Sequence, residues 1–407
     1  MHVTADRRLM AGWAAAMLVF AATTGVESMS WNQLSAFTPL YLHSLGVRPA
    51  QLPAWTAVMA SLSWVIGIPM APFWGVWADR YSRKAVIVRS ALVEALIFTG
   101  WAFSTSPWMA LAFRCLSGFV LGNTGVMLAV QASITPPERV GLAVGIVSSG
   151  SPAGRAVGPA LGALLIHLID IRGMLLVDAA LSVGIAVVLT FTIREPERTK
   201  PVGVSAFRLL RGAFGEIVST PLVWRLFVAT MAAQLGVWIV TPFLPIYIQS
   251  LSRPGSVSAT ATAVGAILST VALAAAIGSA FWGRIVDRFG HVRVLTVTSV
   301  VAAAAILTVG LAGGGLVGLA APMVVYGFFT AAMTVSIMAL LVRTVSEERR
   351  GAVLGQVLFP FYVAGLIGPL LGAALFRHGE LAVMSGAAVA TLIPLAVLLT
   401  LRRPVAA

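Results

Sequence analysis

The chain has 407 residues, of which 59% are hydrophobic and 10% are charged, and its formal net charge is +13 at pH 7. Ordinary soluble domains carry roughly 25% charged residues, so this composition excludes a soluble globular protein and indicates a chain whose solvent is lipid. The single cysteine, Cys115, excludes an internal disulfide, and the five histidines are scattered without metal-ligand spacing.

Twelve apolar runs of about 20 residues follow one another, each long enough to cross a ~30 Å hydrocarbon core as a helix. They lack the alternating pattern of a membrane barrel, and a helix satisfies its backbone polar groups internally. We therefore predict an all-α integral membrane protein whose first segment is a retained helix. In chain order, the expected spans are residues 11–42, 51–75, 85–104, 107–131, 141–166, 173–193, 222–249, 259–283, 292–312, 316–343, 351–376 and 381–401.

The longest connection, residues 195–221, divides the spans into two groups of six. It is charged and contains Pro196 and Pro201, so we interpret it as a cytoplasmic linker. The predicted domains are therefore an N-terminal six-helix bundle, residues 1–194, and a C-terminal six-helix bundle, residues 222–407.

Three sequence pairs indicate that one half duplicates the other. They recur with offsets of 208, 206 and 210 residues: Gly75–Tyr81 with Gly283–Phe289, Phe37–Tyr41 with Phe243–Tyr247, and Gly158-Pro159 plus Gly162 with Gly368-Pro369 plus Gly372. Because each half has an even number of spans, the halves are predicted to be parallel, pseudo-symmetric repeats.

The positive charge follows the predicted topology. With a cytoplasmic N-terminus, 21 of the 27 Lys and Arg residues lie in cytoplasmic loops, tails or helix ends. Four lie outside, at positions 48, 172, 253 and 377, and two lie within spans. This distribution is the positive-inside pattern and predicts that both termini are cytoplasmic. It argues against nucleic acid as a partner.

Three motifs carry a resemblance to a known family. Gly75-x-x-x-Asp79-Arg80-x-x-Arg83-Lys84 lies between spans 2 and 3, with Ser82 where glycine is usual. Arg114-x-x-Ser117-Gly118 lies on span 4. Gly150-x-x-x-Gly154-x-x-x-Gly158-Pro159-x-x-Gly162 lies on span 5, with Arg155 and Ala163 as atypical residues. Over nearly its whole length the chain resembles a twelve-helix major facilitator superfamily transporter of the drug:proton antiporter group.

The charged hairpin after span 2 has a role implied by that resemblance. Asp79 and Arg83 lie four residues apart at a helix end, and a carboxylate near a helix N-terminus is stabilised by the helix dipole. The resemblance implies a conformational latch between the halves, near the start of span 11; a solvated turn is the alternative. The latch residues expected are Gly75, Asp79, Arg80, Arg83, Lys84, Asp287 and Arg288.

The glycines of span 5 form a smooth strip on one helical face, since Gly150, Gly154, Gly158 and Gly162 are spaced by four residues. Pro159 removes a backbone hydrogen bond and favours a bend. We expect a packing or hinge surface against span 8 or span 1, with ordinary membrane packing as the alternative.

Ionisable residues within spans mark function by default, because they are expensive to bury in lipid. Three acids, Glu27, Glu94 and Asp178, accompany the expected buried cations Arg114 and Arg155, so at least one acid lacks a full partner. Low dielectric favours the neutral form of such a carboxyl group, which can then exchange protons. In the resembled fold span 1 lines the central cavity, so Glu27 is our candidate for proton coupling. An ion pair with either arginine is the alternative, and the other two acids are weaker candidates.

Aromatic and polar side chains on the cavity-lining spans could bind a lipophilic substrate. The candidates are Trp31, Asn32, Gln33, Asn123, Gln234, Trp238, Thr241, Tyr326, Phe329, Thr330, Thr334, Phe359 and Tyr362.

We therefore predict a secondary active transporter, a proton-coupled exporter of lipophilic or cationic drug-like compounds that works by alternating access. Sugar or metabolite efflux and lipid translocation are alternatives on the same scaffold. A membrane-embedded enzyme would need converging catalytic groups, and a receptor would favour an added sensing domain. We expect no enzyme activity, no cofactor or metal beyond protons as the coupling ion, a small-molecule substrate, a monomer, and a multi-pass location in the cell (inner or plasma) membrane.

Overall fold

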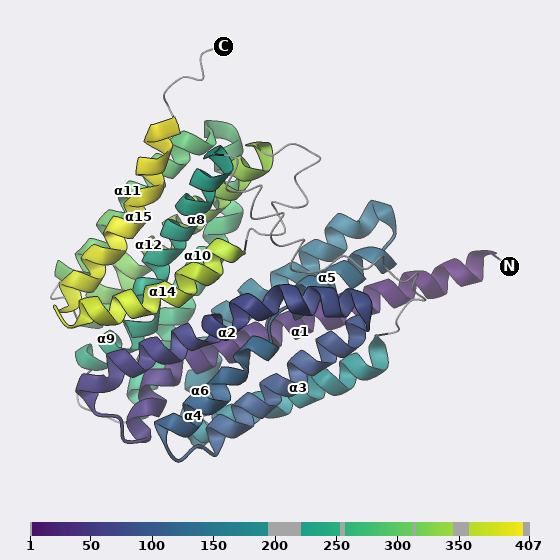
Figure 1. The fold of residues 1–407 in the computed structure, drawn as a ribbon, viewed down its shortest axis with the longest axis horizontal. Helices are drawn as coiled ribbons and strands as arrows, with labels where there is room; N and C mark the ends of the chain where they lie inside the picture. Colours follow the sequence, from purple (N-terminus) through teal and green to yellow (C-terminus); the bar gives the residue numbers. More distant parts are fainter. Residues whose placement is uncertain (1, 194–220, 253–256, 312–314, 345–357, 402–407) are drawn as a thin grey trace, which may run out of the picture. The chain divides into compact units, whose positions relative to one another are not determined.

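The structure is a computed structural model, which describes residues 2–193, 221–252, 257–311, 315–344 and 358–401. Within these ranges it describes no side chains for residues 2–11, 71–72, 75–76, 79, 311, 342–344 and 399–401. Every regular element in the described ranges is helical (Figure 1).

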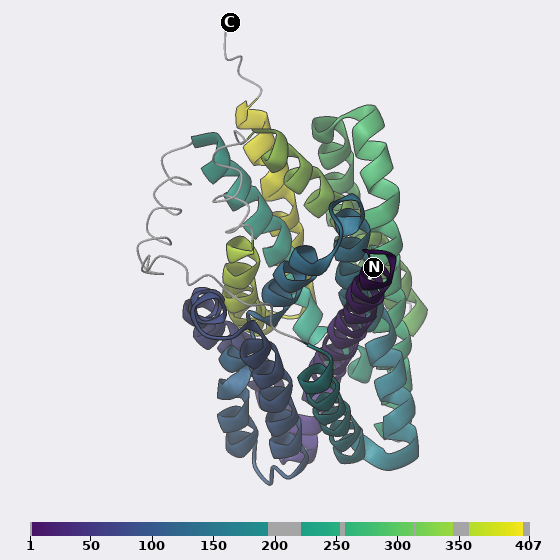
Figure 2. The same cartoon turned by 90° about the vertical axis from the view of Figure 1, so that its right-hand side faces the viewer.

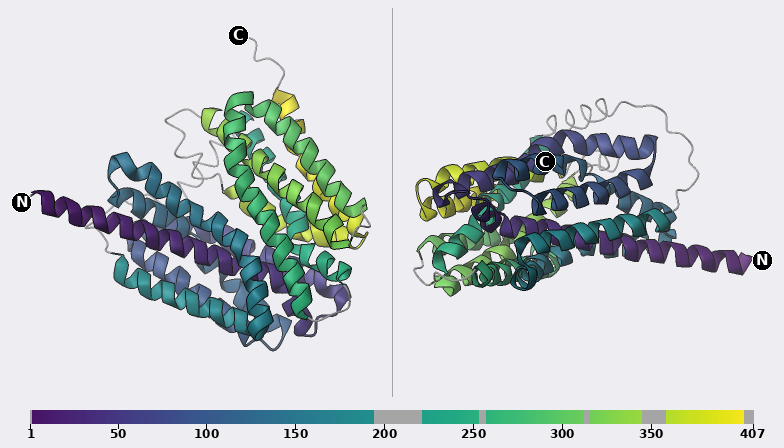
Figure 3. Two further views of the ribbon diagram at one scale, coloured as in Figure 1. Left: turned by 180° about the vertical axis from the view of Figure 1, so that it is seen from behind. Right: turned by 90° about the horizontal axis from the view of Figure 1, so that it is seen from below.

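The described part of the first half contains six α-helices and three short 3₁₀ segments. The α-helices are α1 (His2–Ser44), α2 (Leu52–Arg80), α3 (Arg83–Ala102), α4 (Pro107–Arg114), α5 (Asn123–Ile134) and α6 (Val140–Thr192). The 3₁₀ segments are η1 (Pro49–Gln51), η2 (Cys115–Phe119) and η3 (Pro137–Arg139). Helix α1 is the long purple helix of Figure 3.

The second half begins at residue 221 in the described part of the chain. Its helices are α8 (Pro221–Val240), η4 (Thr241–Phe243), α9 (Leu244–Leu251), α10 (Val257–Phe289), α11 (His291–Leu311), α12 (Gly315–Thr344), α14 (Phe359–Phe376) and α15 (Glu380–Leu401). Helices α14 and α15 both pack on α8, and α12 packs on both α10 and α11 (Figure 2, green to yellow).

These helices agree with the expected membrane spans. Ten helical segments among the described residues are long and apolar enough to cross a membrane. One of them, Pro137–Thr192, contains two expected spans, and α1 supplies one more. The part of expected span 11 before Leu358 and the expected linker lie outside the described residues, apart from residue 221, which begins α8.

The chain divides into two compact units. Unit 1 comprises Met1–Phe37 and Val65–Ala206, and unit 2 comprises Thr38–Trp64 and Phe207–Ala407. Each unit has an apolar core of its own: Trp13, Phe20 and Ile87 are among the core residues of unit 1, and Val286 and Ala332 among those of unit 2. This division assigns Thr38–Trp64 to unit 2, whereas the predicted domains assign these residues to the N-terminal bundle. The predicted boundary near residue 194 stays a prediction.

Span 4 is broken near its middle, although the apolar run predicts one continuous helix. Helix α4 ends at Arg114, the 3₁₀ segment η2 follows, and α5 starts only at Asn123. Gly122 precedes α5 with φ of 93°, a left-handed conformation that favours glycine. The Ser117 hydroxyl donates to the Arg114 carbonyl at 2.7 Å, which helps to end α4.

Spans 5 and 6 are joined through a kink within α6. Asp170 adopts φ of 82° and ψ of 177°, a backbone region that is populated almost only by glycine. Its carboxylate accepts a hydrogen bond from the Gly173 backbone N–H at 2.7 Å. Asp170 therefore ends span 5 and caps the start of span 6 in a single turn.

The two duplicated hairpins turn by different devices at equivalent positions. Ser82 is extended, with φ of −158°, and its hydroxyl accepts a hydrogen bond from the Ala85 N–H at 2.9 Å, so it is the N-cap of α3. Its counterpart Gly290 instead has φ of 84° between α10 and α11. The serine that departs from the family pattern thus replaces a left-handed glycine with a side-chain cap.

The glycine strip of span 5 packs against α1. A Cβ atom added at Gly158 would lie 2.6 Å from the Met29 carbonyl oxygen, and one at Gly162 would lie 2.7 Å from the Phe37 ring. The glycines at positions 150 and 154 face the α1 backbone in the same way. Across this contact the Thr24 hydroxyl donates to the Val147 carbonyl at 2.9 Å. Of the two partners expected for the strip, the structure shows span 1.

Unit 2 repeats this packing with its own residues. A Cβ atom at Gly368 would lie 2.5 Å from the Trp238 Cβ, and one at Gly372 would lie 2.5 Å from the Ile239 carbonyl oxygen. Gly372 also faces Phe243, the sequence equivalent of Phe37. The α14–α8 contact is therefore the counterpart of the α6–α1 contact, which supports the duplication read from the sequence.

Gly158→Ala is expected to lower the free energy of unfolding by ~1–3 kcal/mol, because the added methyl must push α1 away from α6. Gly145→Ala in the same helix is the control, since nothing lies within 4 Å of a Cβ added there. Thermal unfolding of the two purified variants in detergent measures the difference. Equal stability would contradict the close approach.

Candidate functional site

Helix α1 places Glu27 inside unit 1, where the side chain is 8% exposed. Its carboxylate accepts a hydrogen bond from the Asn123 side-chain amide at 2.5 Å. The Asn123 amide oxygen in turn accepts from the Thr124 backbone N–H at 2.8 Å, so the orientation of the amide is fixed. The partner that Glu27 has in the structure is thus a neutral amide rather than a guanidinium.

Asp178 lies on the second part of α6 and is fully buried. One of its carboxylate oxygens accepts a hydrogen bond from the Ser30 hydroxyl at 2.8 Å, while the other, Oδ2, has no hydrogen-bond partner among the described residues. Ser30 is one helical turn from Glu27 on α1. Asp178, a weaker candidate from the sequence, therefore contacts the same helix as Glu27.

Glu94 on α3 is also fully buried, and it lies within electrostatic range of both Glu27 and Asp178. Within the described part of the chain, neither of its carboxyl oxygens makes a well-formed hydrogen bond, although the Ser182 hydroxyl is near. We call Glu27, Glu94 and Asp178 the carboxyl cluster. Because several negative charges are costly to bury inside a membrane bundle, the cluster is suited to hold protons.

The two expected buried cations differ in their surroundings. Arg114 is 7% exposed, and its guanidinium carbon lies 4.9 Å from the centre of the Trp31 ring and 6.0 Å from that of Trp101. The Arg155 side chain lies on the surface of unit 1, so its expected role as a buried cation stays a prediction. Arg155 follows Gly154 directly, so it is turned about 100° away from the glycine face that packs on α1.

The expected substrate-cavity residues of unit 1 lie around the same part of α1. Trp31 packs against Phe98, with ring centres 5.6 Å apart, besides its contact with the guanidinium. The Asn32 amide bonds the Ser28 carbonyl of its own helix at 2.7 Å. Gln33 is fully buried, and its amide has no hydrogen-bond partner among the described residues.

The remaining cavity candidates belong to unit 2. The Gln234 amide donates to the Thr334 hydroxyl at 3.0 Å, which joins α8 to α12. The Tyr326 hydroxyl lies 3.3 Å from that of Thr391. The other hydroxyl candidates, Thr241 and Thr330, bond carbonyls of their own helices.

An aromatic group in unit 2 was only partly foreseen from the sequence. Trp64 stacks on Tyr362 with ring centres 5.2 Å apart and meets Trp238 edge-on at 5.6 Å. The expected candidate Phe329 packs elsewhere, against Trp282 at 5.3 Å, and Phe359 is the first residue of α14. The sequence could have indicated Trp64 as a candidate, because it is an aromatic residue near the middle of expected span 2.

Only part of the expected latch can be placed. The structure does not describe the surroundings of Gly75, the side chain of Asp79 or the start of expected span 11. Arg80, Asp287 and Arg288 are exposed, while Arg83 and Lys84 are half-buried in the first turn of α3. The latch therefore stays a prediction.

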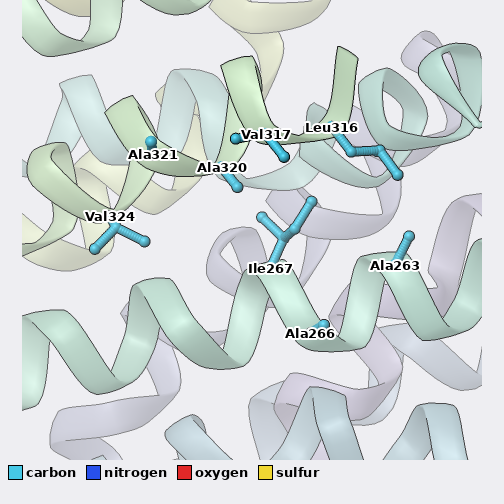
Figure 4. Close-up of a pocket in the computed structure, with 8 residues that line it drawn as sticks. All are labelled: Ala263, Ala266, Ile267, Leu316, Val317, Ala320, Ala321 and Val324. Carbon is cyan, nitrogen blue, oxygen red and sulfur yellow. The ribbon is translucent and has the colours of Figure 1, made fainter. Parts of the chain in front are cut away.

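An apolar groove of 570 Å³ lies in unit 2 between α10 and α12 (Figure 4). Its walls are all aliphatic: Ala263, Ala266, Ile267, Leu316, Val317, Ala320, Ala321 and Val324. A groove without polar groups on a membrane bundle is suited to lipid chains, and it contains no expected site residue. Among the described residues, no group of three or more His, Cys, Asp or Glu side chains is placed to hold a metal ion.

The chain matches known proteins over most of its length. A family model described as Major Facilitator Superfamily matches residues 13–266 and 226–407. A protein named Multidrug resistance protein MdtG from Proteus mirabilis is 30% identical over 344 residues, which cover 84% of each chain. A Lactococcus lactis protein named Multi-drug resistance efflux pump PmrA homolog is 28% identical over 346 residues, 85% of this chain and 84% of the relative.

Two solved structures share the fold at 17% sequence identity. The nucleoside transporter NupG superimposes with a TM-score of 0.76 and covers 96% of this chain and 100% of its own. A bacterial homolog of the human lysosomal transporter Spinster, in an inward-facing and unoccupied conformation, superimposes with a TM-score of 0.72 and covers 95% of each chain.

Ser30→Ala is expected to lower the free energy of unfolding by ~1–3 kcal/mol, because it removes the hydroxyl donor of the buried Asp178 carboxylate. Ser149→Ala is the control, since that exposed hydroxyl bonds only its own helix. Thermal unfolding of both variants is the measurement. A Ser30→Ala protein as stable as the control would show that the buried bond contributes nothing.

Proposed function

The chain belongs to the Major Facilitator Superfamily, and from that membership we propose that it is a proton-coupled exporter of lipophilic or cationic drug-like compounds. The names of its relatives, a multidrug resistance protein and an efflux pump, support export of such compounds. We place it as a multi-pass monomer in the cell membrane with both termini in the cytoplasm, as the distribution of Lys and Arg indicates.

One observation carries the proton-coupling proposal: a buried carboxylate at mid-span whose partner is an amide. Glu27 is 8% exposed, and its hydrogen bond comes from Asn123. An ion pair would fix the charge, whereas a neutral donor allows both forms, since the amide stabilises the carboxylate without cancelling its charge. Charged groups at the centre of a membrane helix cost about 2.5–3.5 kcal/mol on insertion scales, so the neutral form remains accessible.

Exchange follows from competition for that charge. A proton neutralises Glu27, and so does a lipophilic cation beside it; each reduces the cost of keeping the carboxylate in a low dielectric. If the two cannot bind together, cation binding releases the proton, and protonation releases the cation. Alternating access between the two membrane faces then converts this competition into antiport.

The other members of the carboxyl cluster affect the competition between a proton and a cation for Glu27. Glu94 lies within electrostatic range of Glu27, and a negative charge on Glu94 would favour a proton or a cation at Glu27. Trp31 offers an aromatic face on the same helix, and Arg114 already occupies part of it. A substrate with a planar cationic ring would meet both an aromatic surface and a carboxylate in this part of unit 1.

Glu27→Gln is expected to reduce substrate-dependent proton flux by about tenfold or more, because glutamine keeps the shape but cannot exchange the proton. The assay uses purified protein in liposomes with a pH-sensitive dye inside. Glu138→Gln is the matched control, since Glu138 is an exposed carboxylate in η3. Full proton flux in the Glu27 variant would refute the assignment.

The substrate class is tested in the same liposomes. Ethidium, a planar lipophilic cation, is expected to drive proton release, whereas lactose and uridine are expected to drive none. Proton flux with either of the two neutral polar compounds, and none with ethidium, would favour metabolite transport on this scaffold. Ethidium movement without any proton flux would contradict antiport.

A further inference from the structure

The break in span 4 leaves backbone carbonyls that no helix ladder uses. Between Arg114 and Asn123 the chain passes through η2 and the left-handed Gly122. Inside a bilayer an unsatisfied carbonyl costs several kcal/mol, so a broken helix persists only where neighbours supply donors. The donors found here come from α2 and α3.

Trp74 and Arg89 donate hydrogen bonds to two backbone carbonyls in the break between α4 and α5. The Trp74 indole N–H donates to the Gly118 carbonyl at 3.1 Å, and an Arg89 guanidinium N–H reaches the Leu121 carbonyl at 3.4 Å. The Arg89 guanidinium also lies flat against Trp74, 3.3 Å from the ring centre. Trp74 is 6% exposed, so this cation–π contact is shielded from solvent. We call the two side chains the brace.

Arg89 forms few hydrogen bonds apart from those beside the break. Its Nε and Nη1 atoms are buried and make no hydrogen bond within the described residues. A guanidinium that uses so few of its five donors is costly to bury. Its contacts with Trp74, Ser90 and the Leu121 carbonyl all face the break.

The break in turn sets the position of Asn123, which is the first residue of α5 and donates to Glu27 at 2.5 Å. A continuous helix through residues 115–122 would move Asn123 along and around the helix axis, because each residue adds 1.5 Å of rise and 100° of rotation. The carbonyls that the brace bonds, those of Gly118 and Leu121, therefore come just before Asn123, which bonds Glu27.

We propose that Trp74 and Arg89 are positioning residues for Glu27, which act by holding the break in span 4 so that Asn123 stays against the carboxylate. The inference rests on the proposed function, in which Glu27 exchanges the coupling proton. Glu94 on α3 lies within electrostatic range of Glu27, Asp178 on α6 lies within range of Glu94, and Arg114 ends α4. None of these three contacts the brace in the bonds described above.

The test is the pH profile of ethidium-driven proton flux in liposomes. Asn123→Ala gives the reference: it removes the donor that favours ionised Glu27, so half-maximal flux is expected at a pH higher by about one unit. Trp74→Phe keeps the ring but loses the N–H, and Arg89→Lys keeps the charge but loses the flat contact. Each is expected to shift the profile in the same direction by about half a unit or more.

Two matched controls and one double variant complete the design. Trp108→Phe and Arg139→Lys change an exposed tryptophan and an exposed arginine away from the break, and both are expected to keep the wild-type profile. In the Trp74→Phe/Asn123→Ala protein the shift is expected to equal that of Asn123→Ala alone, because both changes act on one contact.

Several outcomes would overturn the inference. Brace variants that lose rate or thermal stability at an unchanged pH profile would show a merely structural role, as would fully additive shifts in the double variant. If Trp74→Phe fails to fold, Arg89→Lys decides alone. Full proton flux in Glu27→Gln would refute the proposed function instead, whereas loss of flux there with unshifted brace variants would refute only the positioning role.

Discussion

The close contact of α1 with the glycine face of α6 is the constraint on which the rest of unit 1 depends. Because the backbones nearly touch along Gly150 to Gly162, the face of α1 that carries Glu27 and Ser30 has a fixed rotation. Ser30 then meets Asp178 on the far part of α6, and Glu27 meets Asn123. Small residues thus hold these two helices together by allowing their backbones to pack closely.

Several ionisable side chains of unit 1 contact neutral hydrogen-bond donors or aromatic rings. Glu27 is bonded by an amide, Asp178 by a hydroxyl, and both Arg89 and Arg114 lie over tryptophan rings. Such partners stabilise a charge without binding it as tightly as an opposite charge would at low dielectric. At Glu27 and Asp178 the protonation state can therefore change beside a neutral hydrogen-bond donor.

Periodicity, composition and motif spacing were enough to predict the helical spans, the duplication and the glycine surface, because each depends on residues near in sequence or on hydropathy alone. The break in span 4 was missed, although Gly118 and Gly122 within an apolar run were its signal. The Ser30–Asp178 and Asn123–Glu27 bonds join residues 148 and 96 positions apart, so only the tertiary fold reveals them.

The repeated glycine contact has an evolutionary consequence. In both units glycine packs against a backbone carbonyl, of Met29 in one and Ile239 in the other, and against a phenylalanine ring, of Phe37 or Phe243. Such a contact places few demands on the side chains that point elsewhere. After the gene segment was doubled, the two copies were free to diverge in chemistry, so that Asn32 in one corresponds to Trp238 in the other. The expected spans of the second half contain no acidic residue, although the helix contact is retained.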